Sequence, residues 1–306
     1  MSGWNRCRIL TEAKSHRRSA SQWAVAWRRF KRNKSALAGS VIVTFFVIVG
    51  IFGPYLAPYP ARSYQPLYEG EAGAPPSWKH PFGVEESGVD VFSEVIHGTK
   101  NDLYVGLAAS FLATLLGIAV GAVAGYFKGA ASHVLLGITQ VFFVIPTLLL
   151  ILLFARVFQV LVFKGLGLTL IVLILALFGW SSISFVVRGE TLRVREMEFV
   201  QAARSLGASN LRLLFRHIVP NILSPVIVYT TLNIAGFILT EVVVSFLGFG
   251  DANTPTWGLI LNEGFTYVRT AWWASLFAGL AVVICVLGFN LVGDGLSDAL
   301  NPRLRE

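Results

Sequence analysis

The chain has 306 residues, of which 55% are hydrophobic and only 14% are charged, whereas about 25% of the residues of a soluble domain are charged. This composition excludes an ordinary soluble domain and predicts a protein embedded in a lipid bilayer. The formal net charge of +8 would suit a nucleic-acid-binding protein, but the basic residues flank long apolar runs. That placement favours anchoring to anionic lipid headgroups, and no nucleic-acid partner is expected.

Six stretches contain no charged residue, and each can cross roughly 30 Å of hydrocarbon as a helix of about 20 residues. They are Ser35–Ala61, Leu103–Phe127, Val134–Ala155, Gly165–Val187, Val219–Thr240 and Ala271–Gly293. We therefore predict an all-α polytopic membrane protein with six transmembrane helices. The first stretch is too long, and too far along the chain, for a cleaved signal peptide.

The distribution of Lys and Arg predicts the orientation. With an inside amino terminus, the inside segments hold 19 of these residues and the outside segments hold 6. The inside segments are 1–34, 128–133, 188–218 and 294–306, and the outside segments are 62–102, 156–164 and 251–270. Because Lys and Arg favour the cytoplasmic side, both termini of this multi-pass cell-membrane protein are predicted to be cytoplasmic.

The first element is a basic cytoplasmic tail, residues 1–34, which ends in a predicted interfacial helix over Gln22–Lys34 with aromatic residues on one face. The first transmembrane helix is predicted over 35–58. A long extracytoplasmic loop rich in Pro and Gly follows over 59–102, and a loop of that length is either functional or disordered. Within it, Asp90–Thr99 is predicted to form a separate short helix on the outer surface of the membrane.

The second span carries a small residue at every fourth position: Ala109, Ala113, Gly117, Gly121 and Gly125. Small residues let two helices approach closely, which is a principal source of association energy in lipid. This ladder predicts close helix packing, and a substrate-lining face is the alternative.

The segment 188–220, between the fourth and fifth spans, is patterned as two short cytoplasmic helices. The first is predicted over Arg195–Leu206, and Gly207 ends it. The second is predicted over Asn210–Val219, with Ser209 as its cap and Pro220 as its end. Two short helices between membrane spans can receive a push from a soluble partner and pass it to the fifth span.

The sequence predicts no catalytic chemistry. It contains no G-x-x-x-x-G-K-[ST] phosphate loop, so no ATP-hydrolysing site and no cofactor are expected in this chain. Its Cys and His residues do not cluster as metal ligands do. Glu241 is the only ionisable residue predicted inside a span, which makes it a functional candidate; a helix-packing hydrogen bond is the alternative. We predict that the chain is not an enzyme.

The predicted cytoplasmic loop resembles the loop of ABC importer permeases: Glu-Ala-Ala, three residues, Gly, and a hydrophobic-Pro pair thirteen residues after the Gly. Here Gln201-Ala202-Ala203, Gly207 and Pro220 match that spacing, with Gln201 in place of Glu and Val219 in place of Leu. Similar loops carry a His at the position of His217. Three further stretches are similar to the C-type permeases of dipeptide and oligopeptide importers: His80–Leu107, Ser245–Gly264 and Asn290–Leu304.

The resemblance implies a type I importer permease fold, with a permease domain over 103–295, a coupling loop at 188–220 and a cytoplasmic tail at 296–306. It also implies a pore-forming subunit that pairs with a sister permease, two cytoplasmic ATPases and an extracytoplasmic substrate-binding protein. Peptides are the expected cargo; nickel and oligosaccharides are the alternatives within the family.

A secondary transporter would need inverted repeats. An intramembrane hydrolase would need a nucleophile with a base. The sequence supports neither.

Overall fold

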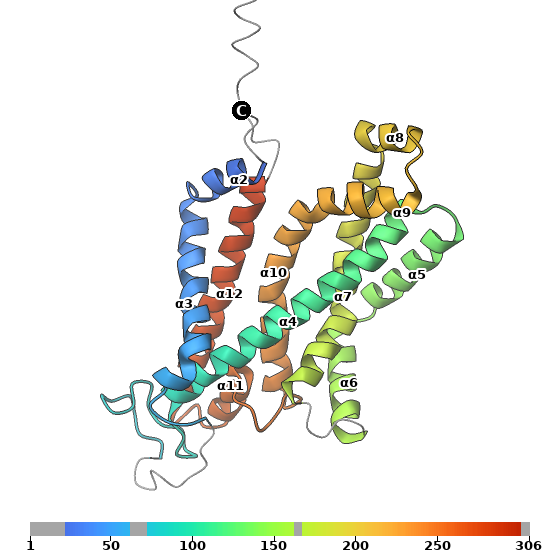
Figure 1. Ribbon diagram of the computed structural model, residues 1–306. Coiled ribbons are helices and arrows are strands. Elements are labelled where there is room, and N and C mark those ends of the chain that lie inside the picture. Colours follow the sequence, from blue (N-terminus) through green and yellow to red (C-terminus); the bar gives the residue numbers. More distant parts are fainter. Residues whose placement is uncertain (1–21, 62–71, 162–166, 301–306) are drawn as a thin grey trace, which may run out of the picture.

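The computed structural model describes residues 22–61, 72–161 and 167–300 (Figure 1). Its regular elements in these ranges are helices, which confirms the predicted all-α class. They are α2 (Gln22–Phe30), α3 (Lys34–Leu56), α4 (Val91–Tyr126), α5 (Ala130–Val144), α6 (Thr147–Leu161), α7 (Leu168–Arg195), α8 (Glu198–Ser205), α9 (Asn210–Arg212), the π-helical η1 (Leu213–Ile218), α10 (Val219–Phe246), α11 (Trp257–Thr266) and α12 (Trp272–Leu300). Most of the predicted basic tail and parts of the outer loop and carboxyl-terminal tail lie outside the described residues.

The predicted third span is broken rather than straight. Five helices, α3, α4, α7, α10 and α12, are long and apolar enough to cross a membrane, and α5 with α6 makes a sixth span when the bent pair is taken together. The two helices meet at an angle of 84°. Pro146 lies at the break, where its ring and missing N–H prevent helix continuation. Ile145 before it is extended, at φ −70° and ψ 132°, as a residue before proline prefers.

The start of α4 differs from the prediction. Asp90–Thr99 is not a separate surface helix, because α4 begins at Val91 and continues without interruption to Tyr126. Asp90 is its N-cap residue, and the Asp90 carboxylate accepts a hydrogen bond from the Ser93 N–H at 2.8 Å. The buried side chains of Val91 and Val95 pack into the core, so the first turns of α4 belong to the bundle.

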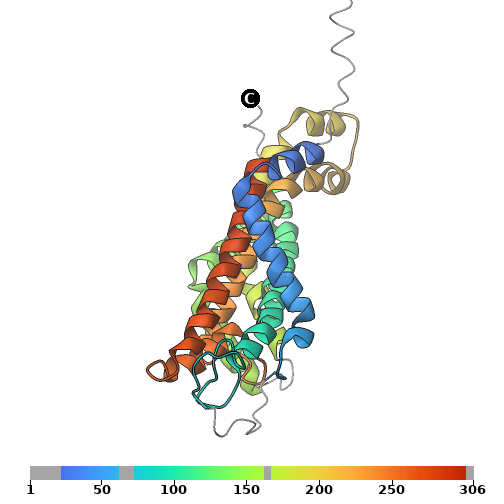
Figure 2. The ribbon, with the colours of Figure 1, turned by 90° about the vertical axis from the view of Figure 1, so that its left-hand side faces the viewer.

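The helices form one bundle in which α4 crosses obliquely between two groups of neighbours (Figure 1). The contact between α4 and α7 is the most extensive of any helix pair, and α3 packs closely on α12. Figure 2 shows α3 and α12 side by side along the length of the bundle. The start of α2, the end of α12 and α8 lie at one end of the bundle, and α11 lies at the other (Figure 1). We refer to these as the α8 end and the α11 end.

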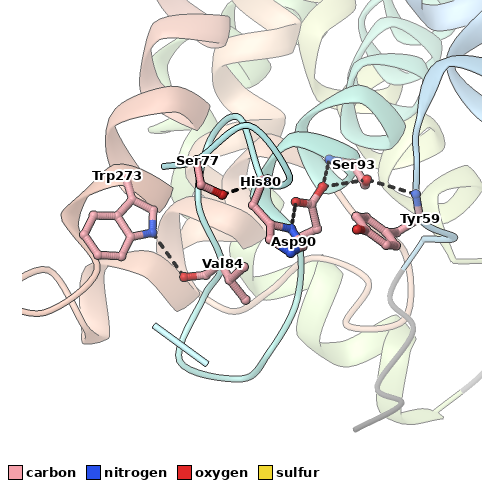
Figure 3. Close-up of polar contacts among 7 residues, drawn as sticks. All are labelled: Tyr59, Ser77, His80, Val84, Asp90, Ser93 and Trp273. Carbon is pink, nitrogen blue, oxygen red and sulfur yellow. Dashed lines mark hydrogen bonds and ion pairs between the residues drawn. The ribbon is translucent and has the colours of Figure 1, made fainter. Parts of the chain in front are cut away.

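At the α11 end, the segment 72–90 is fixed by a buried histidine–aspartate pair (Figure 3). His80 Nδ1 lies 2.7 Å from Asp90 Oδ1, and Asp90 Oδ2 accepts the Ser93 hydroxyl at 2.7 Å. Trp273 of α12 donates its indole N–H to the Val84 carbonyl at 3.1 Å. The Ser93 hydroxyl therefore bonds to the aspartate and not to the histidine. The trio fixes the start of α4 and does not form a histidine-activated serine.

Candidate functional site

The short helix α8 projects from the end of the bundle, beyond α7 and α9 (Figure 1). Val200 attaches it to the protein, because this side chain is completely buried in the core that α4, α7 and η1 also line. Gln201 and Ala202 are exposed on α8, and Ala203 is half-buried. The predicted first helix was misplaced at its start: Arg195 belongs to the end of α7, and α8 begins only at Glu198.

Gly207 lets the chain turn sharply after α8. Its φ is +84°, a left-handed conformation that glycine adopts at little cost. The Gly207 N–H donates to the Arg204 carbonyl at 3.0 Å, and the Ala208 N–H donates to the Ala203 carbonyl at 3.1 Å. This pair of hydrogen bonds is the Schellman arrangement, which satisfies carbonyls at a helix end. The turn therefore fixes the direction of the chain as it leaves α8.

The second helix of the loop continues into the membrane, so the prediction that Pro220 ends it was wrong. The Ser209 side chain caps its start, accepting the Arg212 N–H at 3.4 Å. The helix then widens into the π-helical η1 and continues as α10 with Pro220 in its first turn. Pro220 lies directly after the wider π-helical turn, where the hydrogen-bond register changes, and the helix continues despite the missing proline N–H. Asn221 Nδ2 donates to the carbonyl of His217 at 2.6 Å; His217 itself is half-buried in η1.

Large apolar side chains are exposed around this loop, and the sequence analysis did not identify them. They are Phe199 (42% exposed), Leu206 (89%), Leu211 (62%) and Phe215 (66%). Apolar side chains gathered on an exposed surface mark a place where another protein can bind. Their spacing could not have found them, because Leu211 lies only three positions from the buried Leu214 and Phe199 is next to the buried Val200.

Three hydrogen bonds tie the loop to the adjacent end of α4. The Tyr126 hydroxyl donates to Asn210 Oδ1 at 2.8 Å. Arg195 Nη1 donates to the carbonyls of Gly125 and Tyr126, at 3.0 and 3.1 Å. These carbonyls are in the last turn of α4, where a cation is favourable. α4, α7 and α9 are therefore held together at the α8 end. Tyr126 and Arg195 did not stand out in the sequence, because neither belongs to a recognisable motif.

The small-residue ladder of α4 lies against α7. A Cβ atom added to Gly117 would come within 2.6 Å of Ile183, and one added to Gly121 would come within 2.5 Å of the Ser184 carbonyl. A Cβ atom on Gly125 would meet Thr191 at 2.8 Å. Ala109 and Ala113 are completely buried. This face of α4 is covered by a helix and does not line an open passage.

Glu241 lies near the other end of α10, far from the loop, and is completely buried. Its Oε1 accepts the Ser245 hydroxyl at 2.6 Å. The prediction that Glu241 is the only ionisable residue within a span was wrong. Asp102 lies inside α4, is also completely buried, and faces Glu241. The sequence analysis assigned Asp102 to the outer loop because Lys100 beside it interrupts the apolar run.

A cavity of about 230 Å³ lies between α6, α7 and α10. Its walls are mostly apolar, and Thr147 and Thr240 are the polar residues among them. The volume is below the roughly 300–1,000 Å³ typical of sites for small organic ligands.

The fold defines the class of protein. The chain superposes on an inward-facing structure of the MetNI methionine ABC transporter with a TM-score of 0.58, covering 69% of this chain and 97% of that one, at 17% sequence identity. It is 36% identical to the dipeptide transport system permease protein DppC of Bacillus subtilis, over 96% of this chain and 90% of DppC. It is also 36% identical to the glutathione transport system permease protein GsiD of Escherichia coli O157:H7, over 92% of this chain and 91% of GsiD.

Two family profiles match the chain. Residues 117–306 match the binding-protein-dependent transport system inner membrane component, and residues 21–76 match the N-terminal TM domain of oligopeptide transport permease C. The chain belongs to the family of binding-protein-dependent transport system inner membrane components. It is a multi-pass permease subunit of an ABC importer in the cell membrane, and it works with ATPase subunits and a binding protein. The predicted all-α permease fold, the family and the cell-membrane location are confirmed, and the cytoplasmic position of the two termini stays a prediction.

Proposed function

We propose that this chain forms one half of the passage of a peptide importer and transmits ATPase movement to that passage through α8, η1 and α10. The observation that carries the proposal is the construction of the loop. α8 presents exposed apolar side chains at the end of the bundle while Val200 anchors it in the core. An element that is exposed on one side and fixed on the other can transmit a force.

The route of transmission follows the helices. Closure of two ATPases on ATP would move α8, and the Gly207 turn would pass that movement to α9. One continuous helix runs from Asn210 through η1 and α10 to Phe246, and only its hydrogen-bond register changes in η1. Tyr126 and Arg195 would move the end of α4 together with the loop. α4 and α10 would then tilt as a pair and open the passage alternately to each side.

The partners follow from the two ends of the bundle. The ATPases would bind at the α8 end, which is the cytoplasmic side in the proposed orientation with both termini inside. The extracytoplasmic binding protein would deliver its ligand at the α11 end. The cavity between α6, α7 and α10 is smaller than a typical small-molecule site. We therefore propose that a sister permease completes a passage wide enough for a peptide. No cofactor is assigned to this chain, because ATP is used by the partners.

The substrate class is proposed from the relatives. DppC is named for dipeptides, GsiD for glutathione, and the amino-terminal profile for oligopeptides. These ligands share a short peptide backbone with charged ends. We propose short peptides as the cargo, ahead of nickel or oligosaccharides.

The experiment is to co-express the chain with its partner subunits and to measure ATPase retention and peptide uptake. Ala202→Glu and Leu206→Asp place a charge on the exposed surface of α8 and of the turn after it, where the charge would be desolvated when an ATPase binds. Both variants should insert at normal abundance but release the ATPases and lose uptake. Arg212→Lys, a conservative change at an exposed position of the same loop, is the control and should retain both. Full uptake by Ala202→Glu and Leu206→Asp with ATPases still bound would contradict this route.

A further inference from the structure

Two acidic side chains face one another inside the bundle, near the α11 end. Asp102 comes from α4 and Glu241 from α10, and neither has any exposed surface. Asp102 accepts the first N–H of α11, and the next residue, Gly258, packs against Val242 and Ser245 of α10, beside Glu241, so the two carboxyl groups are neighbours. Two ionised carboxylates in such contact would repel strongly when water is excluded. At least one of the two negative charges must therefore be neutralised.

The hydrogen bonds around the pair leave one oxygen of each carboxyl group without a donor. Asp102 Oδ2 accepts the backbone N–H of Trp257 at 2.9 Å, and Glu241 Oε1 accepts the Ser245 hydroxyl at 2.6 Å. Asp102 Oδ1 and Glu241 Oε2 are buried and have no donor among the described residues. Unpartnered buried oxygens are costly. One hydrogen atom placed between these two oxygens would satisfy both.

The surroundings supply no cation that could replace this hydrogen atom. Phe46 of α3 packs edge-on against Trp257 of α11, beside the pair. The thiol of Cys285, in α12, is the other titratable group near enough to Asp102 to interact with its charge. A neutral thiol carries no positive charge and cannot neutralise the pair. No described Lys, Arg or His forms a hydrogen bond or an ion pair with either carboxyl group. The described residues also contain no group of three metal-binding side chains.

We propose that Asp102 and Glu241 bind one proton between them, in a buried proton site that joins α4, α10 and α11. The protonated carboxyl group donates to the other one, as in carboxyl pairs that share a single proton. The remaining negative charge lies beside the first N–H of α11. The amino-terminal end of that helix carries partial positive charge, and this stabilises the anion.

The site makes the packing of three elements depend on this proton. If the proton is removed at high pH, two anions face each other and their repulsion weakens the packing of α4 on α10. An amide in place of either carboxyl group removes one charge and supplies an N–H donor of similar size. Asp102→Asn and Glu241→Gln should therefore imitate the protonated pair, whereas Asp102→Ala leaves a gap and no donor.

The first test is infrared spectroscopy of the permease complex purified with its partners, in H₂O and in D₂O at neutral pH. A protonated carboxyl group has a carbonyl band separate from those of amides and carboxylates, and the band shifts in D₂O. The wild-type complex should show such a band, and Asp102→Asn and Glu241→Gln should each remove it. Asp294→Asn, at an exposed position of α12, and Cys285→Ala should keep it. A wild-type spectrum without the band, or a band unchanged in both amide variants, would overturn the proposal.

The second test is thermal unfolding of the same complexes from neutral to alkaline pH. The wild-type melting temperature should fall as pH rises by more than those of Asp102→Asn and Glu241→Gln, while Asp294→Asn should follow the wild type. Equal pH dependence in all four complexes would contradict a shared proton. So would a wild-type stability that rises with Na⁺ concentration at fixed pH, because a bound cation would then neutralise the pair. Neither test depends on transport, so the proton site can fail while the proposed function stands.

Discussion

Tyr126, the last residue of α4, donates its hydroxyl hydrogen to Oδ1 of Asn210, the first residue of α9, at 2.8 Å. α4 packs along α7, and the helix that starts at Asn210 leads into α10. This contact joins two long helices at the end of the bundle where α8 projects. It is the shortest described side-chain link between α4 and the coupling loop.

Tyr126→Phe should therefore weaken coupling more than folding. Loss of one partly buried hydrogen bond lowers the free energy of unfolding by about 0.5–1.5 kcal/mol, which leaves most of the protein folded. We expect normal membrane abundance with more ATP hydrolysed for each peptide imported. Asn210→Ala should have the same effect, and the double variant should be no worse than either single one, because both remove the same bond. Strictly additive losses in uptake would show that the bond is not the link.

The turn at Gly207 offers a matched comparison. Gly207 and Gly129 both have φ +84°, and an added Cβ would meet nothing within 4 Å at either position. Valine should be strained at both positions, by about 1–3 kcal/mol, and Gly129, with φ 84° and ψ −152°, has a backbone conformation that is in practice open only to glycine. Only Gly207→Val should redirect the chain after α8 and so uncouple ATP hydrolysis from uptake. Gly207→Asn should retain coupling, because asparagine tolerates this conformation. Equal loss of coupling in Gly129→Val and Gly207→Val would mean that strain, and not direction, is responsible.

The α4–α7 contact can be tested with another glycine pair. Gly121→Ala places a methyl group 2.5 Å from the Ser184 carbonyl, and overpacking of this kind typically costs about 1–3 kcal/mol. Gly236→Ala in α10 meets nothing within 4 Å and should be neutral or stabilising, because alanine favours a helix by roughly 1 kcal/mol over glycine. Thermal unfolding in detergent measures both. A Gly121→Ala protein as stable as wild type would show that α4 and α7 are farther apart than described.

Hydropathy alone predicted where the chain crosses the membrane, because long uncharged runs have few alternatives to a transmembrane helix. Hydropathy did not predict whether each transmembrane segment is one continuous helix or a broken one. Pro146 was visible in the third run, but sequence cannot say whether a proline kinks a membrane helix slightly or breaks it by 84°. Pro220 shows the opposite outcome. The wider π-helical turn of η1 precedes it, and the helix continues.

The candidate site was predictable where it is local and not where it depends on packing. Gly207 and the cap Ser209 follow from backbone chemistry that a short motif carries. The Tyr126–Asn210 bond joins residues 84 positions apart, and nothing in either local sequence indicates it. Asp102 was missed for a similar reason. Its burial depends on α10, α11 and α12 closing around it, whereas its neighbours in sequence include a lysine that reads as the edge of a loop.

The orientation can be tested by cysteine labelling in intact cells, on a background in which Cys7 and Cys285 are replaced. Ala252→Cys is exposed in the connection between α10 and α11, and Lys128→Cys is exposed between α4 and α5. An impermeant thiol reagent added outside should label the first and not the second, because the positive-inside rule places the α8 end in the cytoplasm. Lys128→Cys should react only after permeabilisation. The reverse labelling pattern would invert the proposed topology.

The most direct measurement of the central proposal is uptake of a labelled dipeptide by proteoliposomes that contain this chain, its sister permease and the two ATPases, with the binding protein added outside. We expect uptake that requires ATP inside and the binding protein outside and that persists without an ion gradient. Uptake should stop when Ala202→Glu replaces the wild-type chain. Uptake driven by an ion gradient in the absence of ATP and of the ATPases would contradict the account.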